Sequence, residues 1–168
     1  MAVFFSWKGE IMSIRVLFVC HGNICRSPMA EFVFHHKVAE CGLSAQFQIA
    51  SAATSREEIG NPVHPGTQTK LREKHIPMWP HQAVQMKRSD YDAYDLLIGM
   101  DDWNLRNMLR IVGSDPKGKL HKLLDFTDRG GDIADPWYTG NFDVTYRDID
   151  EGCDGLLRAI FAKGWVNK

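Results

Sequence analysis

The chain has 168 residues, four of which are cysteines, and a formal net charge of −1 at neutral pH. This length is typical of one domain that buries a substantial core. The balanced charge excludes a general attraction to nucleic acid or to an anionic membrane, so we expect neither as a partner. The chain is too poor in cysteine for a secreted disulfide scaffold and shows no secretory signal, so we expect a cytoplasmic protein.

The first twelve residues stand apart from the rest of the sequence. They hold only a short apolar run, and a regular pattern begins just after Met12. We expect residues 1–12 to be an extension that is disordered or that precedes an alternative start, and residues 13–168 to form one domain. No stretch approaches the roughly 18 apolar residues that a membrane-spanning helix requires.

Strands and helices are predicted to alternate along this domain. The predicted order is a buried strand over 14–19, a helix from Ser27 to Gly42, a strand over 47–50, a helix from Pro65, a strand over 94–100, a helix over 102–111, a weaker strand over 120–126, and a final helix after a loop at 128–140. Ser27 is the expected N-cap of the first helix, with Pro28 at its first position. This alternation predicts an α/β fold, with a doubly wound, four-stranded parallel sheet and helices on both faces.

The loop between the first strand and the first helix carries the strongest functional signal. It reads Cys20-His21-Gly22-Asn23-Ile24-Cys25-Arg26-Ser27. In doubly wound sheets, ligands bind at the carboxyl ends of the strands. A short loop that leads into a helix turns its N–H groups inward, and these groups hold a tetrahedral oxyanion with help from the helix dipole. The residues from His21 to Ser27 are therefore the predicted phosphate-binding loop.

Individual residues of this loop suit that role. Gly22 and Asn23 tolerate the positive φ that a tightly curled loop requires. Arg26 can clamp two phosphate oxygens with its planar guanidinium. Cys20 would lie at the edge of the loop, where the N–H groups, Arg26 and a hydrogen bond from Ser27 favour its thiolate. A thiolate that faces a bound phosphoryl group is a nucleophile ready for in-line attack.

Cys20 and Arg26 have the C-x5-R spacing of cysteine-dependent phosphatases, and the string from Val19 to Pro28 is more specific. Placed after a buried strand, it resembles the low-molecular-weight protein tyrosine phosphatase family, and the resemblance extends from about Arg15 to the final helix. It implies a phosphatase domain over 13–168 that hydrolyses phosphotyrosine esters through a phosphocysteine intermediate, without a cofactor. The implied partners are phosphotyrosine-containing proteins or aryl phosphates, and we expect a monomer or a weak dimer.

The resemblance also implies further site residues. An Asp-Pro followed by aromatic residues on a late loop makes Asp135 the general acid, with Trp137 and Tyr138 as walls for the substrate ring. Ser51 is expected to hydrogen-bond Asn23 and so to hold the loop in shape. Cys25 is expected to have a redox role, because the equivalent residue in the family can form a disulfide with the nucleophile and protect it from irreversible oxidation.

Some features depart from the family pattern or leave other activities open. Many relatives carry an aromatic residue near Glu57, where this chain has acidic residues. Arsenate reductases of this architecture need relay cysteines after the third strand, and none occurs between Met100 and Gly152. Protein-arginine phosphatases typically have threonine in place of Ile24, so Ile24 favours the aryl ester and phosphoarginine is the alternative.

No metal is expected, because the histidines lack ligand spacing and are predicted to be solvated: His35, His36, His64, His75 and His81.

Overall fold

A computed structural model describes residues 13–166, so the expectations for residues 1–12 lie outside the described part of the chain. Its strands are β1 (Ile14–Cys20), β2 (Phe47–Ala53), β3 (Leu96–Gly99) and β4 (Leu120–Lys122). They form a parallel sheet in the order β2-β1-β3-β4, and helices cover both faces. The predicted fold class is confirmed.

The helices follow the strands in the predicted alternation, with two short additions. They are α1 (Arg26–Glu40), α2 (Pro65–Glu73), α3 (Asp90–Ala93), α4 (Asp102–Val112), α5 (Pro136–Thr139) and α6 (Phe142–Ala162), with 3₁₀ turns η1 (Ser44–Gln46) and η2 (Leu123–Phe126). The four-residue helices α3 and α5 were not predicted, because segments this short show no helical periodicity in the sequence. Among the described residues, no helix is both long and apolar enough to cross a membrane.

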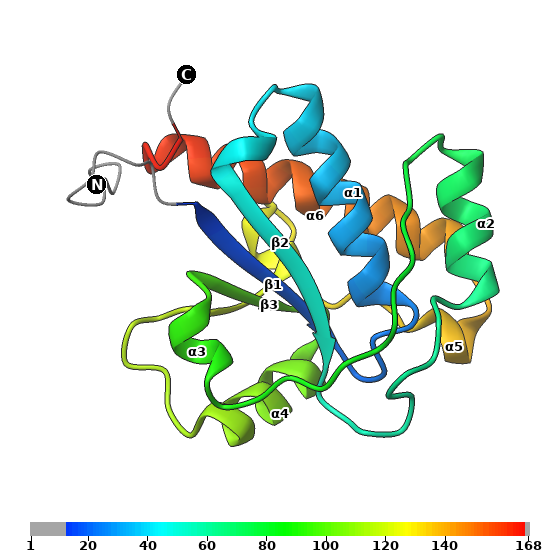
Figure 1. Cartoon of the computed structure of the whole chain (residues 1–168), viewed down its shortest axis with the longest axis horizontal. Helices are drawn as coiled ribbons and strands as arrows, with labels where there is room; N and C mark the ends of the chain where they lie inside the picture. Colours follow the sequence, from blue (N-terminus) through cyan, green and yellow to red (C-terminus); the bar gives the residue numbers. More distant parts are fainter. Residues whose placement is uncertain (1–12, 167–168) are drawn as a thin grey trace.

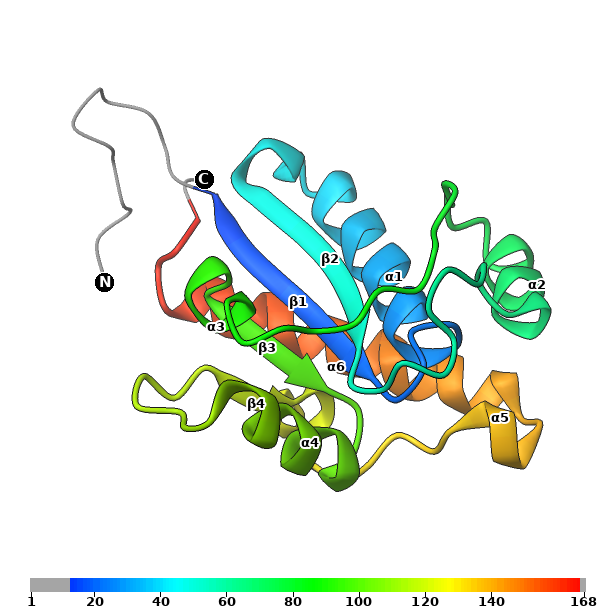
Figure 2. The same cartoon turned by 60° about the horizontal axis from the view of Figure 1, so that its bottom comes forward.

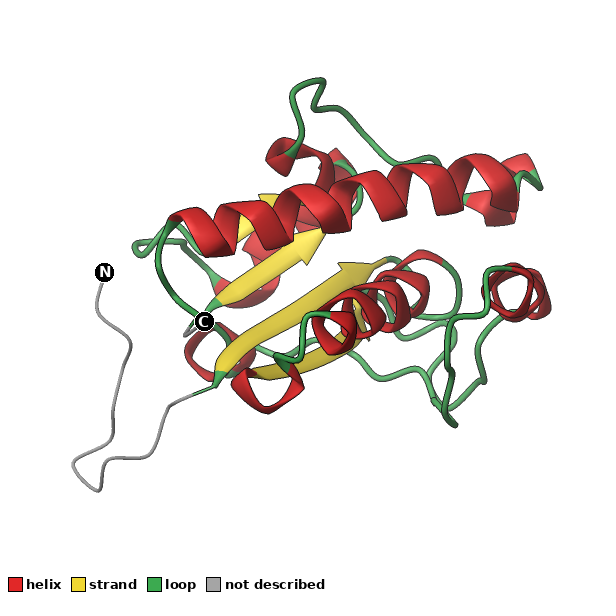
Figure 3. Ribbon diagram, turned by 90° about the horizontal axis from the view of Figure 1, so that it is seen from above, coloured by secondary structure: helices red, strands yellow, loops and turns green. Residues whose placement is uncertain are grey.

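Alternate residues of β1 enter two separate hydrophobic clusters. Val16 and Phe18 pack with residues of α1 and α6 on one face of the sheet. Leu17 and Val19 pack with Met108 and other residues of α3 and α4 on the opposite face. Figures 1 and 2 show α1 and α6 together on one side of the strands and α4 on the other. In Figure 3 the long helix α6 extends past both ends of the strands. Burial on both faces explains why β1 reads as an almost continuous apolar run.

Two predicted boundaries are wrong for physical reasons. Helix α1 begins at Arg26, with Cys25 rather than Ser27 at the N-cap position, and Ser27 instead directs its hydroxyl to Cys20. The fourth strand ends at Lys122, and the 3₁₀ turn η2 follows it. In this turn, Leu123 and Leu124 both enter the core and are fully buried.

The parallel strands end at one edge of the sheet and deliver several loops there. The loop before α1 follows β1, residues 54–64 follow β2, and Asp101 follows β3. Residues 127–135 approach the same edge, where Ile133 donates its backbone N–H to the carbonyl of Met100 at 2.9 Å. Figures 1 and 2 show the loop before α1 at the same end of the molecule as α5. Segments distant in sequence therefore meet at the carboxyl end of β1.

Candidate active site

Cys20 ends β1, and its sulfur is the point on which the following loop converges. The backbone N–H groups of Asn23 and Ser27 donate to Cys20 Sγ at 3.3 and 3.4 Å, and the Ser27 hydroxyl lies 3.0 Å from it. Cys20 is 3% exposed. Several donors directed at one sulfur stabilise negative charge on it, so the geometry suits a thiolate.

The tight curl of the loop depends on Asn23 and Gly22 in different ways. Asn23 has φ 58°, in the left-handed region that asparagine tolerates better than most residues. Gly22 does not have a positive φ, contrary to the sequence prediction. A Cβ on Gly22 would lie 3.3 Å from Cγ of Glu58, so the glycine provides room for the neighbouring segment. Asn23 thus supplies the backbone conformation of the turn, and Gly22 permits the close packing of Glu58.

Arg26 is 2% exposed and connects three parts of the site. Its Nη1 donates to Asp101 Oδ2 at 2.6 Å and to the carbonyl of Ile133 at 2.9 Å, and its Nη2 donates to Asp135 Oδ2 at 3.3 Å. Burial opposes the charge of Arg26, but Cys20 and Asp101 outweigh burial and raise its pKa. The buried Nε has no acceptor among the described residues, so a donor remains for an oxyanion. Asp101, which caps α4, therefore also fixes this guanidinium.

Asp135 lines the same cavity as the loop and caps α5. Its Oδ1 accepts from the N–H of Trp137 at 3.0 Å, while Oδ2 faces Arg26. A cavity of about 90 Å³ is lined by Cys20, His21, Gly22, Ile24, Cys25, Glu57, Glu58, Asp135, Trp137 and Tyr138. Trp137 is 57% exposed and Tyr138 81%, so both rings stand at the rim. The structure thus brings the predicted nucleophile, acid and aromatic walls to one small cavity.

The lining of this cavity is also acidic. Glu57 and Glu58 contribute to it, and the Nε2 of His21 lies 3.0 Å from Glu57 Oε2. The cavity is therefore lined by both aromatic rings and carboxylates.

Behind the loop, a buried polar chain holds Asn23. Its Nδ2 donates to the Ser27 hydroxyl at 2.8 Å and to the Ser51 hydroxyl at 2.9 Å, which is the contact expected for Ser51. Ser51 in turn donates to Glu31 Oε1 at 2.6 Å. Asn23 is fully buried, so the conformation of the loop is fixed from within the fold.

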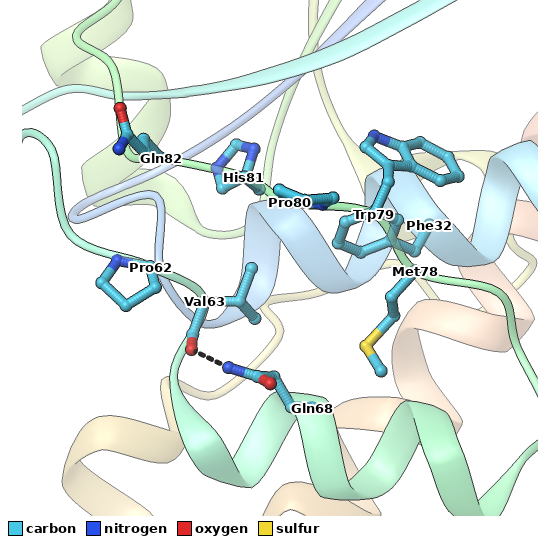
Figure 4. A pocket seen from close by; sticks show the side chains of 9 residues that line it. All are labelled: Phe32, Pro62, Val63, Gln68, Met78, Trp79, Pro80, His81 and Gln82. Carbon is cyan, nitrogen blue, oxygen red and sulfur yellow. Dashed lines mark hydrogen bonds between the residues drawn. The ribbon is translucent and has the colours of Figure 1, made fainter.

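His81 completes this network, so the prediction that it is solvated is wrong. Its side chain is 10% exposed, with Nε2 3.1 Å from Asn23 Oδ1 and Nδ1 4.0 Å from Glu31. Burial lowers the pKa of His81, opposed in part by the hydrogen bond to Asn23. Figure 4 shows His81 on the wall of a groove of about 740 Å³, near Trp79 and Val63. No spacing signal in the sequence connects His81 to a loop 58 residues earlier.

Cys25 lies beside the cavity as a second thiol of the same loop. It is 4% exposed, and burial together with the negative charge of Cys20 raises its pKa to about 12. All four cysteines are free thiols. Within residues 13–166, no group of three or more His, Cys, Asp or Glu side chains is arranged to hold a metal ion.

Comparison with known proteins places this geometry in a family. Residues 15–165 match the family model of the low molecular weight phosphotyrosine protein phosphatases. The chain is 40% identical to low molecular weight protein-tyrosine-phosphatase YfkJ of Bacillus subtilis over 149 residues, which are 88% of this chain and 96% of that protein. It is 39% identical to PtpA of Staphylococcus epidermidis over 148 residues, which are 88% of this chain and 94% of that protein.

Solved structures agree with the sequence comparison. The crystal structure of YfkJ from Bacillus subtilis superposes with a TM-score of 0.89 at 39% identity, covering 92% of this chain and 99% of that one. At lower identity, 26%, a Drosophila arginine phosphatase superposes with a TM-score of 0.79, covering 87% of this chain and 97% of that one. The chain belongs to the low molecular weight phosphotyrosine protein phosphatase family.

Proposed function

We propose that this protein is a phosphotyrosine phosphatase that uses Cys20 as its nucleophile, Arg26 as its phosphate clamp and Asp135 as its general acid. The observation that carries the proposal is the set of donors directed at the Cys20 sulfur, in a cavity that Asp135 also lines. We assign the activity to residues 13–168. A monomer or a weak dimer in the cytoplasm is part of this proposal, and the free thiols support a reducing compartment.

In the first step, the Cys20 thiolate attacks phosphorus in line with the ester oxygen. A P–S bond forms as the P–O bond to the aryl group breaks, and Asp135 gives its proton to the departing phenolate. Arg26 and the N–H groups of the loop stabilise the charge on the equatorial oxygens. The products of this step are a phenol, a phosphocysteine and the Asp135 carboxylate.

In the second step, water attacks the phosphocysteine. The Asp135 carboxylate takes a proton from the water as its oxygen bonds to phosphorus, and the P–S bond breaks. Inorganic phosphate and the Cys20 thiolate are released, and Asp135 is again a carboxylic acid. The donors that hold the thiolate in the resting site also stabilise it as a leaving group.

The dimensions of the cavity support an aryl ester as the substrate. Cys20 is almost fully buried, and the rings of Trp137 and Tyr138 stand at the rim. A phosphotyrosine ring is long and flat enough to carry phosphorus down to the sulfur between these rings. Phosphoserine is shorter, and its alkoxide is a much poorer leaving group. Phosphotyrosine-containing proteins are therefore the proposed partners.

Phosphoarginine is the second candidate substrate, because an arginine phosphatase shares the fold. It has sufficient length, but Ile24, which lines the cavity, offers its guanidinium N–H groups no acceptor. An arsenate reductase is not favoured, since the segment between Met100 and Gly152 has no relay cysteine.

A substrate panel tests this choice. We would measure kcat/KM of the purified protein for peptides that differ only in carrying phosphotyrosine, phosphoarginine or phosphoserine. We expect phosphotyrosine first, phosphoarginine well behind and phosphoserine near background. Ile24→Thr should raise the phosphoarginine rate relative to phosphotyrosine, while Ile24→Val, the matched apolar control, should leave the ratio unchanged. A wild-type preference for phosphoarginine would overturn the proposed substrate class.

A further inference from the structure

Lys122, the last residue of β4, lies between two carboxylates at the edge of the site. Its Nζ is 2.9 Å from Asp102 Oδ1 and 2.9 Å from Asp132 Oδ1. The Lys122 side chain is 15% exposed, and the two hydrogen bonds raise its pKa. It therefore remains a cation that joins the start of α4 to the segment that precedes Asp135.

On its N-terminal side, the segment that Lys122 holds follows Arg129, which pairs with Asp148 and Glu151 of α6, and then two glycines. Gly130 and Gly131 both have positive φ, at 60° and 96°, and no atom lies within 4 Å of where their Cβ would be. Such residues let the backbone pivot. Asp132 follows directly, so its pair with Lys122 is the first side-chain attachment after the pivot.

The attachments beyond Asp132 belong to the catalytic centre itself. Ile133 donates its N–H to Met100 and accepts from Arg26, and Asp135 meets Arg26 at only 3.3 Å. Asp102, the other partner of Lys122, adjoins Asp101, which holds Arg26 at 2.6 Å. Lys122 thus connects two segments to the end of β4: the loop that carries Asp135, and the start of α4, where Asp101 holds Arg26.

We infer that Lys122 is a positioning residue for the general acid: by pairing with Asp132 and Asp102, it sets the distance between Asp135 and the ester oxygen. Lys122 lines no part of the cavity around Cys20, so it acts through the loop and not on the substrate. The inference rests on the proposed function, since it concerns the proton that Asp135 delivers. A small displacement of a catalytic group has a large effect on rate, because proton transfer requires contact distance.

The test is Lys122→Met, assayed with aryl phosphates whose phenols span a wide range of pKa. We expect a loss in kcat/KM of about tenfold for a weakly acidic phenol, and little loss for a strongly acidic phenol that leaves without a proton. In an Asp135→Ala background, Lys122→Met should have no further effect, because no acid remains to be positioned. Lys122→Arg, which keeps the cation between the carboxylates, should restore most of the rate.

Lys37 provides a matched control. It also joins two aspartates, Asp150 at 2.7 Å and Asp154 at 2.8 Å, and its side chain is 19% exposed, but it lies between α1 and α6. Lys37→Met should leave the leaving-group dependence at the wild-type value.

The outcomes separate the two proposals. An equal loss in Lys122→Met for all leaving groups, or an additive loss in the Asp135→Ala background, would overturn the inference. If wild type hydrolyses aryl phosphates and Asp135→Ala alone shows leaving-group dependence, the proposed function stands and the role of Lys122 fails. If wild type does not hydrolyse aryl phosphates, the proposed function itself fails.

Discussion

Cys25 lies in the same loop as Cys20, the proposed nucleophile, but is held as a protonated thiol. Burial raises its pKa to about 12, so at neutral pH it does not compete with Cys20 as a nucleophile. Peroxide would convert the Cys20 thiolate to a sulfenic acid, and the Cys25 thiol would then condense with it to form a disulfide, with the thiol proton and the sulfenic hydroxyl leaving as water. We predict that wild type regains most of its activity with dithiothreitol after peroxide treatment, whereas Cys25→Ser does not.

Cys41 supplies the control for this redox prediction, because it is the exposed thiol among the four cysteines. Cys41→Ser should recover as fully as wild type. Full recovery of Cys25→Ser after the same treatment would show that Cys25 does not protect the nucleophile.

The buried carboxyl of Glu31 is predicted to make the stability of the protein depend on pH. Burial raises its pKa above the ordinary 4.5, opposed in part by the hydrogen bond from Ser51. Above pH 4.5, the unfolded chain releases this proton before the folded protein does. The free energy of unfolding therefore falls as pH rises from 4.5 through the folded pKa. Glu31→Gln keeps an acceptor for Ser51 and should remove that loss.

Urea unfolding over this pH range measures the effect of Glu31. The stability of Glu31→Gln minus that of wild type should increase with pH. A flat difference for Glu31→Gln would contradict the assigned direction of the pKa shift.

The residues proposed to bind phosphate were predictable from sequence, but those that support them were not. Cys20 and Arg26 lie in one contiguous loop, so their motif can be read directly from the sequence. Asp135 could also be predicted, from the Asp-Pro that precedes two aromatic residues. The side chains behind it come from separate elements: Glu31 from α1, His81 from the segment before α3, and Lys122 from β4. Only the folded chain brings these together, since no spacing along the sequence encodes their contacts.

At the scale of elements, α6 packs closely on the turn η2, which follows Lys122. A Cβ on Gly155 would lie 2.2 Å from the carbonyl oxygen of Phe126, and one on Gly152 would lie 2.5 Å from Leu123. The two glycines let α6 approach η2 and so define the base from which the acid-bearing loop departs. The strand predicted over 120–126 includes η2, because apolar residues alone do not distinguish a strand from a buried turn.

We predict that Gly155→Ala lowers the free energy of unfolding by about 1–3 kcal/mol, because the backbone of Phe126 cannot yield as a side chain would. Alanine is the better helix former by about 1 kcal/mol, so the sign of the change separates packing from helix propensity. Thermal or urea unfolding measures it, with the exposed Arg158→Ala on the same helix as the control. A stabilised Gly155→Ala would refute the close packing of α6 on η2.

For the whole molecule, the fold itself supplies the positive charge that phosphoryl transfer needs. Arg26 would supply this charge, because it is almost fully buried beside Cys20 and its Nε has no partner within the described chain. We therefore predict that activity survives EDTA and that vanadate inhibits it competitively, since vanadate resembles the pentacoordinate transition state. Loss of activity on chelation, with recovery on adding zinc or magnesium, would contradict this prediction.

The central claim, that Cys20 carries the phosphoryl group between the two steps, is tested most directly by trapping the intermediate. Wild type would be mixed with a ³²P-labelled phosphotyrosine peptide, quenched within one turnover, and digested to locate the label. We predict that the label lies on Cys20 as a phosphocysteine, and that Cys20→Ser shows neither label nor turnover. Label on another residue, or substantial turnover by Cys20→Ser, would contradict the account.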